Sequence, residues 1–67
     1  MTKELQPHQQ RVVDEKADLD EKLVKLLAFH GTETFADLPE EEQDRLIRQS
    51  VAMTNYSAVL GERIVAF

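Results

Sequence analysis

The sequence predicts an all-α protein, an antiparallel helical hairpin that pairs with a second copy to form a homodimeric four-helix bundle. Two long segments carry apolar or small residues in alternating steps of four and three, the a/d spacing of packed helices. The connection between them is short, which favours antiparallel neighbours. The apolar rows of the second segment cover roughly 200° of its circumference, whereas a surface helix needs about 100°. Since one partner helix cannot cover that width, we expect a second hairpin to pack against it.

The first helix is predicted over about residues 7–29 of a single domain spanning 1–67. Pro7 suits the first helical position, where its fixed φ is helical and its missing N–H is not needed. The predicted seam consists of Val12, Lys16, Leu19, Leu23, Leu26 and His30, and the flanking row of Val13, Ala17, Val24 and Leu27. The outer face carries opposite charges at i,i+4, which predict the pairs Arg11–Glu15, Asp18–Lys22 and Glu21–Lys25.

The connection is predicted as a loop over residues 30–38. Gly31 is suited to the left-handed conformation that often ends a helix. Phe35 and Leu38 are the large apolar residues of this segment, and we expect them to plug the end of the hairpin.

The second helix is predicted over about residues 39–65. Pro39 suits its first position, and three following glutamates complement the helix dipole. The expected cap is Asp37 or Leu38, of which Asp37 has the better side chain. The predicted seam consists of Leu46, Ser50, Met53, Ser57, Leu60, Ile64 and Phe67, and the second apolar row of Ile47, Val51, Ala58 and Val65. Gly61 costs about 1 kcal/mol within a helix. Either another backbone approaches closely there, within the hairpin or across a dimer, or the helix frays.

Composition narrows the class of protein. The chain has 67 residues, 8 Lys and Arg against 13 Asp and Glu, a net charge of −5 and no cysteine. A core of this size is barely sufficient, and no disulfide can support it, so helix pairing or oligomerisation must supply the missing stability. There is no apolar run long enough to span a membrane and no signal-peptide pattern. We therefore expect a soluble, cytoplasmic protein. Its acidity disfavours nucleic acid as a direct ligand and suits a partner with a basic surface.

No residue set predicts catalysis, a cofactor or a metal. His8 and His30 lie about 33 Å apart along one helix and cannot share a metal ion. Ser50 and Ser57 lie on the seam, where small residues serve helix packing better than nucleophilic chemistry. Two glycines cannot form a phosphate-binding loop. We expect a protein that is not an enzyme.

Four residues are candidates for contact with a partner: Phe35, Arg45, Arg48 and Tyr56. Each also has a structural interpretation. Tyr56 can border the core with its hydroxyl in water, and Phe35 can belong to the plug. The two arginines can pair with Glu41 and Asp44. The residues assigned to the core or dimer interface are Val12, Leu19, Leu23, Leu26, Leu46, Met53, Leu60 and Ile64.

Three stretches carry a resemblance to a known family: HQQRVVDEKADLDEKL, FADLPEEEQDRL and AMTNYSAVLGERIVAF. From about Pro7 to Phe67 the chain resembles small phage and prophage helical-hairpin proteins, a family that includes the phage quorum-sensing anti-activator. That member is a short helical dimer. It binds the DNA-binding domain of the host activator LasR, a LuxR-type regulator, and inhibits a pilus-assembly ATPase. No contact residue is transferred from the family, because the residues that the chain shares with it have the character of structural positions. These shared residues are Gln9, Arg11, Val12, Asp14, Glu15, Leu19, Pro39, Glu42 and Gly61.

The resemblance implies a phage-encoded inhibitor that sequesters a host protein, with the DNA-binding domain of a quorum-sensing activator as the preferred target. The alternative is a structural or assembly module of a phage or host complex, without an inhibitory role. A nucleic-acid binder is disfavoured by the charge. The pairing of helices across the dimer is left open.

Overall fold

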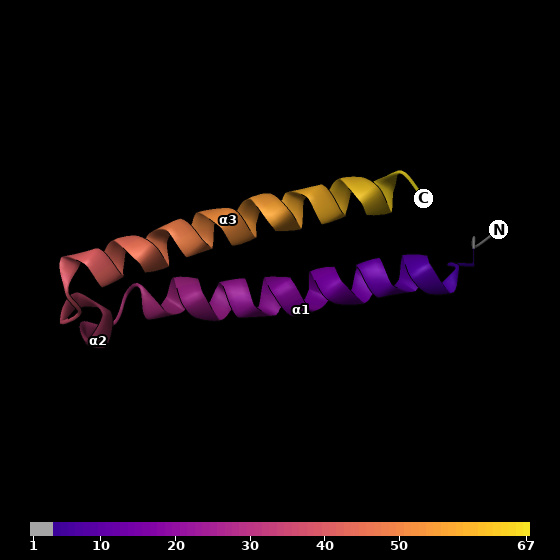
Figure 1. The fold of residues 1–67 in the computed structure, drawn as a ribbon. Helices are drawn as coiled ribbons and strands as arrows, with labels where there is room; N and C mark the ends of the chain where they lie inside the picture. The colour runs from indigo at the N-terminus through magenta and orange to yellow at the C-terminus, as the bar shows by residue number, and fades with distance from the viewer. Residues whose placement is uncertain (1–3) are drawn as a thin grey trace.

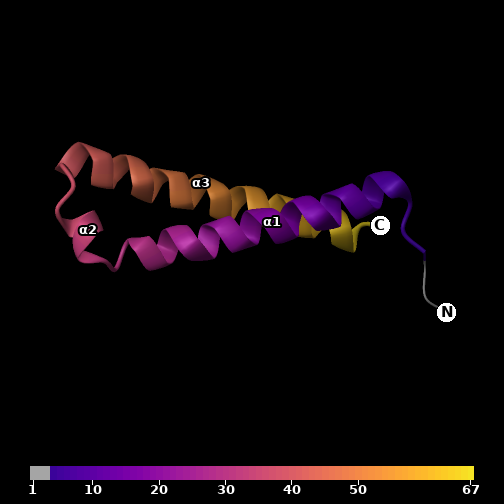
Figure 2. The same cartoon turned by 90° about the horizontal axis from the view of Figure 1, so that it is seen from below.

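The computed structural model describes residues 4–67, which form three helices and no strand. These are α1 (Pro7–Phe29), the short α2 (Glu33–Ala36) and α3 (Glu40–Val65). The long helices α1 and α3 lie antiparallel, α2 closes one end, and the C-terminus returns to the end where α1 begins (Figures 1 and 2). The molecule is a rod of 52 × 16 × 15 Å. The all-helical class and the hairpin-like arrangement of the long helices are thus confirmed, while the dimeric bundle stays a prediction.

The start of α1 follows from its local sequence. Pro7 occupies the first turn, and Gln6 is the N-cap in an extended conformation. The backbone N–H of Gln6 donates to the side-chain oxygen of Gln9 at 2.9 Å. One backbone donor at the helix start is therefore satisfied by a side chain three residues later.

The end of α1 differs from the prediction for Gly31. No glycine in residues 4–67 has a positive φ, and the C-cap is His30 in the right-handed region. The N–H of Gly31 instead donates to the carbonyl of Ala28 at 3.2 Å, and that of Thr32 to Phe29 at 3.0 Å. These i→i−3 bonds tighten the last turn, so a left-handed residue is not needed to end the helix.

Residues 30–38, predicted as a loop, contain α2. Thr32 caps it, because its hydroxyl donates to the carbonyl of Phe29 at 2.7 Å and accepts from the N–H of Phe35 at 3.2 Å. The ring of Phe35 packs edge-to-face on Phe29, with centroids 5.9 Å apart, and lies 4.9 Å from the ring of His30. Phe35 therefore closes the end of the hairpin from within a helical turn.

The cap predicted for the second helix is wrong. Asp37 is the C-cap of α2, and the N-cap of α3 is Pro39, so α3 begins at Glu40. Proline has no side-chain acceptor, and the turn is held from inside α3. The side-chain amide of Gln43 donates to the carbonyls of Phe35, Ala36 and Leu38 at 3.1, 3.1 and 3.0 Å. These bonds tie the connecting segment to the first turns of α3, and they lie outside the pattern that cap preferences describe.

The core is a single seam between α1 and α3. Val12 and Leu60 are 5% and 1% exposed, and the two seam serines are also buried. The remaining residues assigned to the core are half-buried in the single chain: Leu19, Leu23, Leu26, Leu46, Met53 and Ile64. Two helices touch along one stripe only, so most seam side chains keep an edge in solvent.

Candidate protein-interaction surfaces

One side of the hairpin carries a continuous apolar face. In an antiparallel pair, the residues that flank the seam on the same heptad side of each helix lie on one side of the pair. Here both flanking rows are apolar and come together. We define the apolar face as Val13, Ala17, Val24 and Leu27 of α1 with Ile47, Val51, Ala58 and Val65 of α3.

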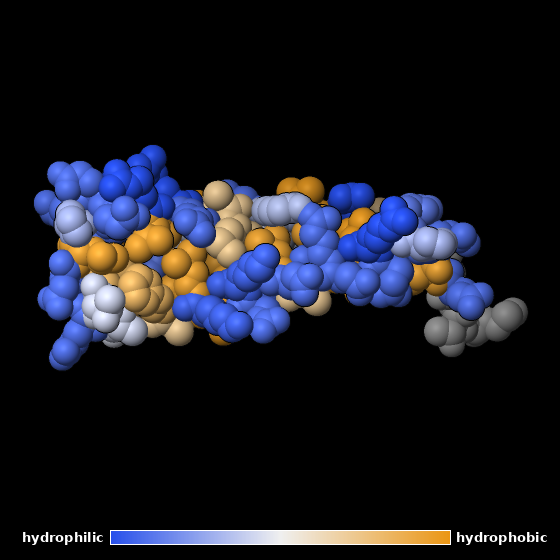
Figure 3. All heavy atoms as spheres, turned by 60° about the horizontal axis from the view of Figure 1, so that its bottom comes forward, coloured by the Kyte–Doolittle hydropathy of each residue, from blue (hydrophilic) through white to orange (hydrophobic). Residues whose placement is uncertain are grey.

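Several large side chains of the apolar face are exposed to solvent in the single chain. Val24 is 66% exposed, Val51 54% and Val65 89%, and Leu27 and Ile47 are also exposed. Leaving so many aliphatic side chains in water forgoes about 25 cal/mol for each Å² of apolar surface. Figure 3 shows one side of the rod, where hydrophobic side chains gather towards the α2 end and hydrophilic ones cover much of the remaining length.

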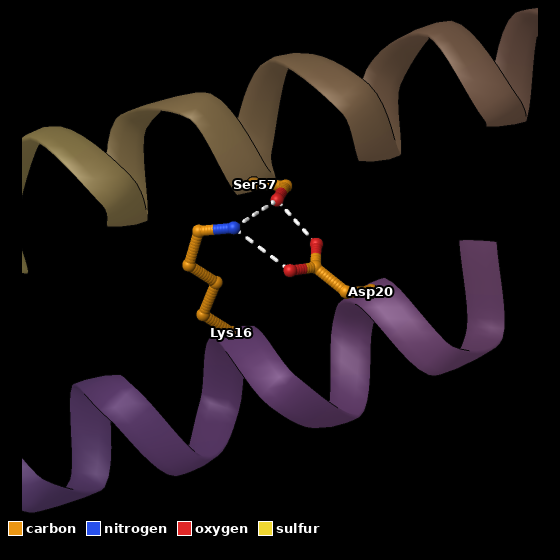
Figure 4. A network of polar contacts seen from close by, with 3 residues as sticks. All are labelled: Lys16, Asp20 and Ser57. Carbon is orange, nitrogen blue, oxygen red and sulfur yellow. Dashed lines mark hydrogen bonds and ion pairs between the residues drawn. The ribbon is translucent and has the colours of Figure 1, made fainter. Parts of the chain in front are cut away.

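Asp20 lies between Ala17 and Val24 in the α1 row of this face, where it is the one charged residue, and its half-exposed carboxylate is bonded to side chains of both long helices. Lys16 donates from Nζ to one carboxylate oxygen of Asp20 at 2.7 Å and to the hydroxyl of Ser57 at 3.0 Å. Ser57 donates to the other oxygen of Asp20, which closes a triangle between α1 and α3 (Figure 4). The triangle thereby joins Ser57 to two residues far from it in the sequence, Asp20 at a separation of 37 positions and Lys16 at a separation of 41.

Gly61 is explained by the same triangle. A Cβ at this position would lie 3.3 Å from Cε of Lys16, closer than ordinary van der Waals contact. Within the hairpin, the nearest group is therefore a lysine side chain of α1 and not a backbone, while a close approach across a dimer stays a prediction. Fraying is also wrong as an explanation, because α3 continues to Val65.

The triangle lowers the pKa of Asp20 below its ordinary value of 3.8. The hydrogen bond from Lys16 is the main cause, followed by the hydrogen bond from Ser57, and partial burial opposes both. Bonds that favour the ionised carboxylate stabilise the folded state only while the group is ionised. This contribution is present above the unfolded-state pKa and is lost as the pH falls through the lower, folded-state value.

Asp20→Asn is therefore expected to reduce the stability of the fold in a pH-dependent way. The difference in unfolding free energy from wild type is largest above about pH 4 and shrinks as the pH falls below it. Urea unfolding followed by circular dichroism over an acidic pH series measures this difference. Glu62→Gln is the matched control for the loss of one negative charge. A pH-independent difference for Asp20→Asn would contradict the assigned role of the triangle.

The opposite side of the seam carries a shallow groove. It has a volume of about 480 Å³ and lies chiefly on α1, with one aromatic residue from α3. We call it the Tyr56 groove, and its lining residues are Arg11, Asp14, Glu15, Asp18, Leu19, Lys22 and Tyr56. Sequence reasoning singled out Tyr56 but missed the groove, because nothing in the spacing shows which part of α1 lies beneath that ring.

The four predicted contact residues do not form one site. Phe35 lies in the aromatic cluster at the closed end, and Tyr56 borders the groove. Arg45 and Arg48 lie together beside a second, open hollow of about 440 Å³ near the start of α3. Both arginines pair within their helix, Arg45 with Glu42 at 3.1 Å and Arg48 with Asp44 at 2.9 Å. The predicted pairing of Arg45 with Glu41 is wrong by one residue.

The predicted ion pairs of α1 form only in part. Lys25 pairs with Glu21 at 3.2 Å, as expected. Among residues 4–67, Arg11–Glu15 and Asp18–Lys22 do not form ion pairs, which corrects two predictions. These four side chains all line the Tyr56 groove. The groove is therefore bordered by charged groups that form no ion pair within the described residues.

Two further findings concern the described part of the chain. Within residues 4–67, no three histidine, aspartate or glutamate side chains gather in a way that could hold a metal ion. Over the same range, none of the helices combines the length and the apolar character that crossing a membrane requires.

The fold is a helical hairpin with one solvent-exposed apolar face and one groove lined by charged residues. These features are typical of a small protein-interaction module. The chain belongs to the Sequestin family, whose model matches residues 6–66. The family description suggests a protein-sequestering role, and with the small all-helical fold it suggests a non-catalytic protein that binds a partner protein. No curated protein and no solved structure matches the chain.

Proposed function

We propose that this chain is a homodimeric, phage-encoded inhibitor that acts in the bacterial cytoplasm by sequestering a host protein. The observation that carries the sequestering role is the family match over residues 6–66. The preferred target is the DNA-binding domain of a LuxR-type quorum-sensing activator, and a pilus-assembly ATPase is a second target. The choice of these targets rests on the resemblance described above.

The homodimer is supported by the apolar face. Two copies that pack these faces together on a two-fold axis would convert each wet row into the core of a four-helix bundle. The face contributes aliphatic residues from both helices, and its one carboxylate, Asp20, is already hydrogen-bonded within the chain. An apolar interface with no unpaired charge is typical of an obligate dimer.

A basic target is supported by charge. The net charge of −5 attracts a cationic protein surface and repels nucleic acid. A DNA-binding domain has such a surface, and an acidic rod bound to it would block the DNA by occupancy. No catalytic step and no cofactor is needed for this mechanism.

Capture from host lysate tests the proposal. The tagged dimer is expected to retain a DNA-binding transcriptional activator, and the purified pair is expected to lose DNA binding in a gel-shift titration. Recovery of virion or scaffold components would support the alternative, a structural or assembly module. Salt-sensitive binding of DNA by the chain itself would overturn the sequestering mechanism.

A further inference from the structure

We propose that the Tyr56 groove receives an arginine side chain from the sequestered protein. The inference rests on the proposed sequestering function and assigns the chemistry of its contact. The occupant is a protein surface that presents one protruding guanidinium group to the middle of the groove.

The lining of the groove includes one aromatic residue, Tyr56, and one aliphatic residue, Leu19. Tyr56 is 47% exposed, and its hydroxyl makes no hydrogen bond with any other side chain or backbone group in residues 4–67. Leu19, which is half-buried, lines the same groove. An exposed tyrosine ring attracts a cation that lies over its face, through the ring quadrupole.

Charge along the groove has a definite order. Arg11 and Lys22 mark its two ends on α1, roughly 16 Å apart at 1.5 Å per residue. The carboxylates of Asp14, Glu15 and Asp18 lie between them. Asp14 accepts a hydrogen bond from Gln10 at 3.0 Å, whereas Glu15 and Asp18 have no ion-pair or hydrogen-bond partner in the described part of the chain. The middle of the groove therefore offers two free carboxylates.

Arginine matches this arrangement better than other side chains. Its planar guanidinium stacks on an aromatic face and binds carboxylates in a bidentate manner, whereas lysine brings a compact, strongly hydrated charge. An acidic side chain would be repelled by the central carboxylates. The basic ends of the groove restrict the attraction to its centre, which fixes where along the groove the guanidinium group of a basic partner would bind.

The groove stays open when the apolar face is covered. Tyr56 and the acidic residues of α1 lie on the heptad side of the seam opposite the apolar face, which follows from the helical period. A dimer formed through the apolar face would thus present two symmetry-related grooves. Dimerisation and partner binding would use different sides of the same hairpin.

A titration with a defined peptide tests the inference. The probe is acetyl-Gly-Gly-Arg-Gly-Gly-amide, added to the full-length ¹⁵N-labelled protein and followed by amide chemical shifts. Shifts are expected at residues 11–22 and around Tyr56, with dissociation constants in the millimolar range. The matching lysine peptide is expected to bind about threefold or more weakly. Equal shifts along both sides of the rod, or equal binding of a glutamate peptide, would overturn the inference.

Variants sharpen the test. Tyr56→Leu and Asp18→Asn are each expected to weaken the arginine peptide about fivefold or more, since each removes one favourable contact. Glu62→Gln removes a carboxylate of α3 outside the groove and is expected to leave binding unchanged. Unchanged helicity and mass of all variants establish that the fold is intact. Equal weakening by Asp18→Asn and Glu62→Gln would mean that only overall charge matters, which contradicts a specific site.

Failure of this inference can be told apart from failure of the proposed function. If the lysate yields a target that binds Tyr56→Leu and Asp18→Asn as tightly as wild type, sequestering stands and the groove is not its site. If no target is captured while the arginine peptide binds at the groove, the groove stands and the proposed function fails. A target whose affinity falls about tenfold or more with either variant supports both.

Discussion

Leu60→Asp is expected to unfold the protein. Leu60 is 1% exposed, the most completely buried large side chain among residues 4–67, and it lies in the seam between the long helices. An aspartate there would place an unpaired charge against aliphatic neighbours, or would require the hairpin to open so that water reaches it. Because a domain of this size has little stability in reserve, loss of the helical circular dichroism signal is the expected result.

Two comparisons make the result specific. Leu60→Met keeps the volume and apolar character and is expected to cost less than about 1.5 kcal/mol. Leu23→Asp, at a half-buried seam position of α1, is expected to unfold the proposed dimer as well. If either aspartate variant retained full helicity and the mass of wild type, the seam would be placed wrongly.

Val51→Asp is expected to dissociate the proposed dimer without unfolding the hairpin. Val51 belongs to the apolar face and is 54% exposed in the single chain, so an aspartate there is solvated in the monomer. In the proposed dimer, each copy would contribute one aspartate at position 51, so the interface would bury two carboxylates. The dissociation constant is therefore expected to rise roughly 100-fold or more. Light scattering distinguishes the monomer of 7.7 kDa from a dimer of twice that mass.

Val59→Asp is the matched control. It changes the same residue type on the same helix at nearly the same exposure, 51%, but on the other side of the seam. It is expected to leave the dimer intact. Dissociation by both variants would point to a general charge effect, and dissociation by neither would mean that the apolar face is not the interface.

The parts of the candidate site that sequence reasoning reached are those that depend on one helix at a time. Tyr56 stands out as an aromatic residue beside the seam, and it does border a groove. Asp20 within an apolar row, with Lys16 and Ser57 at seam positions, is the sequence signal for the polar triangle, but spacing alone does not show that the three side chains meet. The charged rim of the groove was misread as a set of internal ion pairs, because i,i+4 spacing permits pairing without requiring it.

The all-helical class and the hairpin-like arrangement follow from local signals in the sequence, namely the four-three periodicity, Pro7 at a helix start and a short connection. The three-dimensional structure adds the contacts that depend on the register between α1 and α3. It placed Ser57 against Asp20 and the Lys16 side chain against Gly61. It also set the start of α3 through Gln43 and closed α1 without a left-handed glycine. Local preferences allow several helix ends, among which bonds to nearby residues select one. The register between α1 and α3 is selected by the packing of residues far apart in the chain.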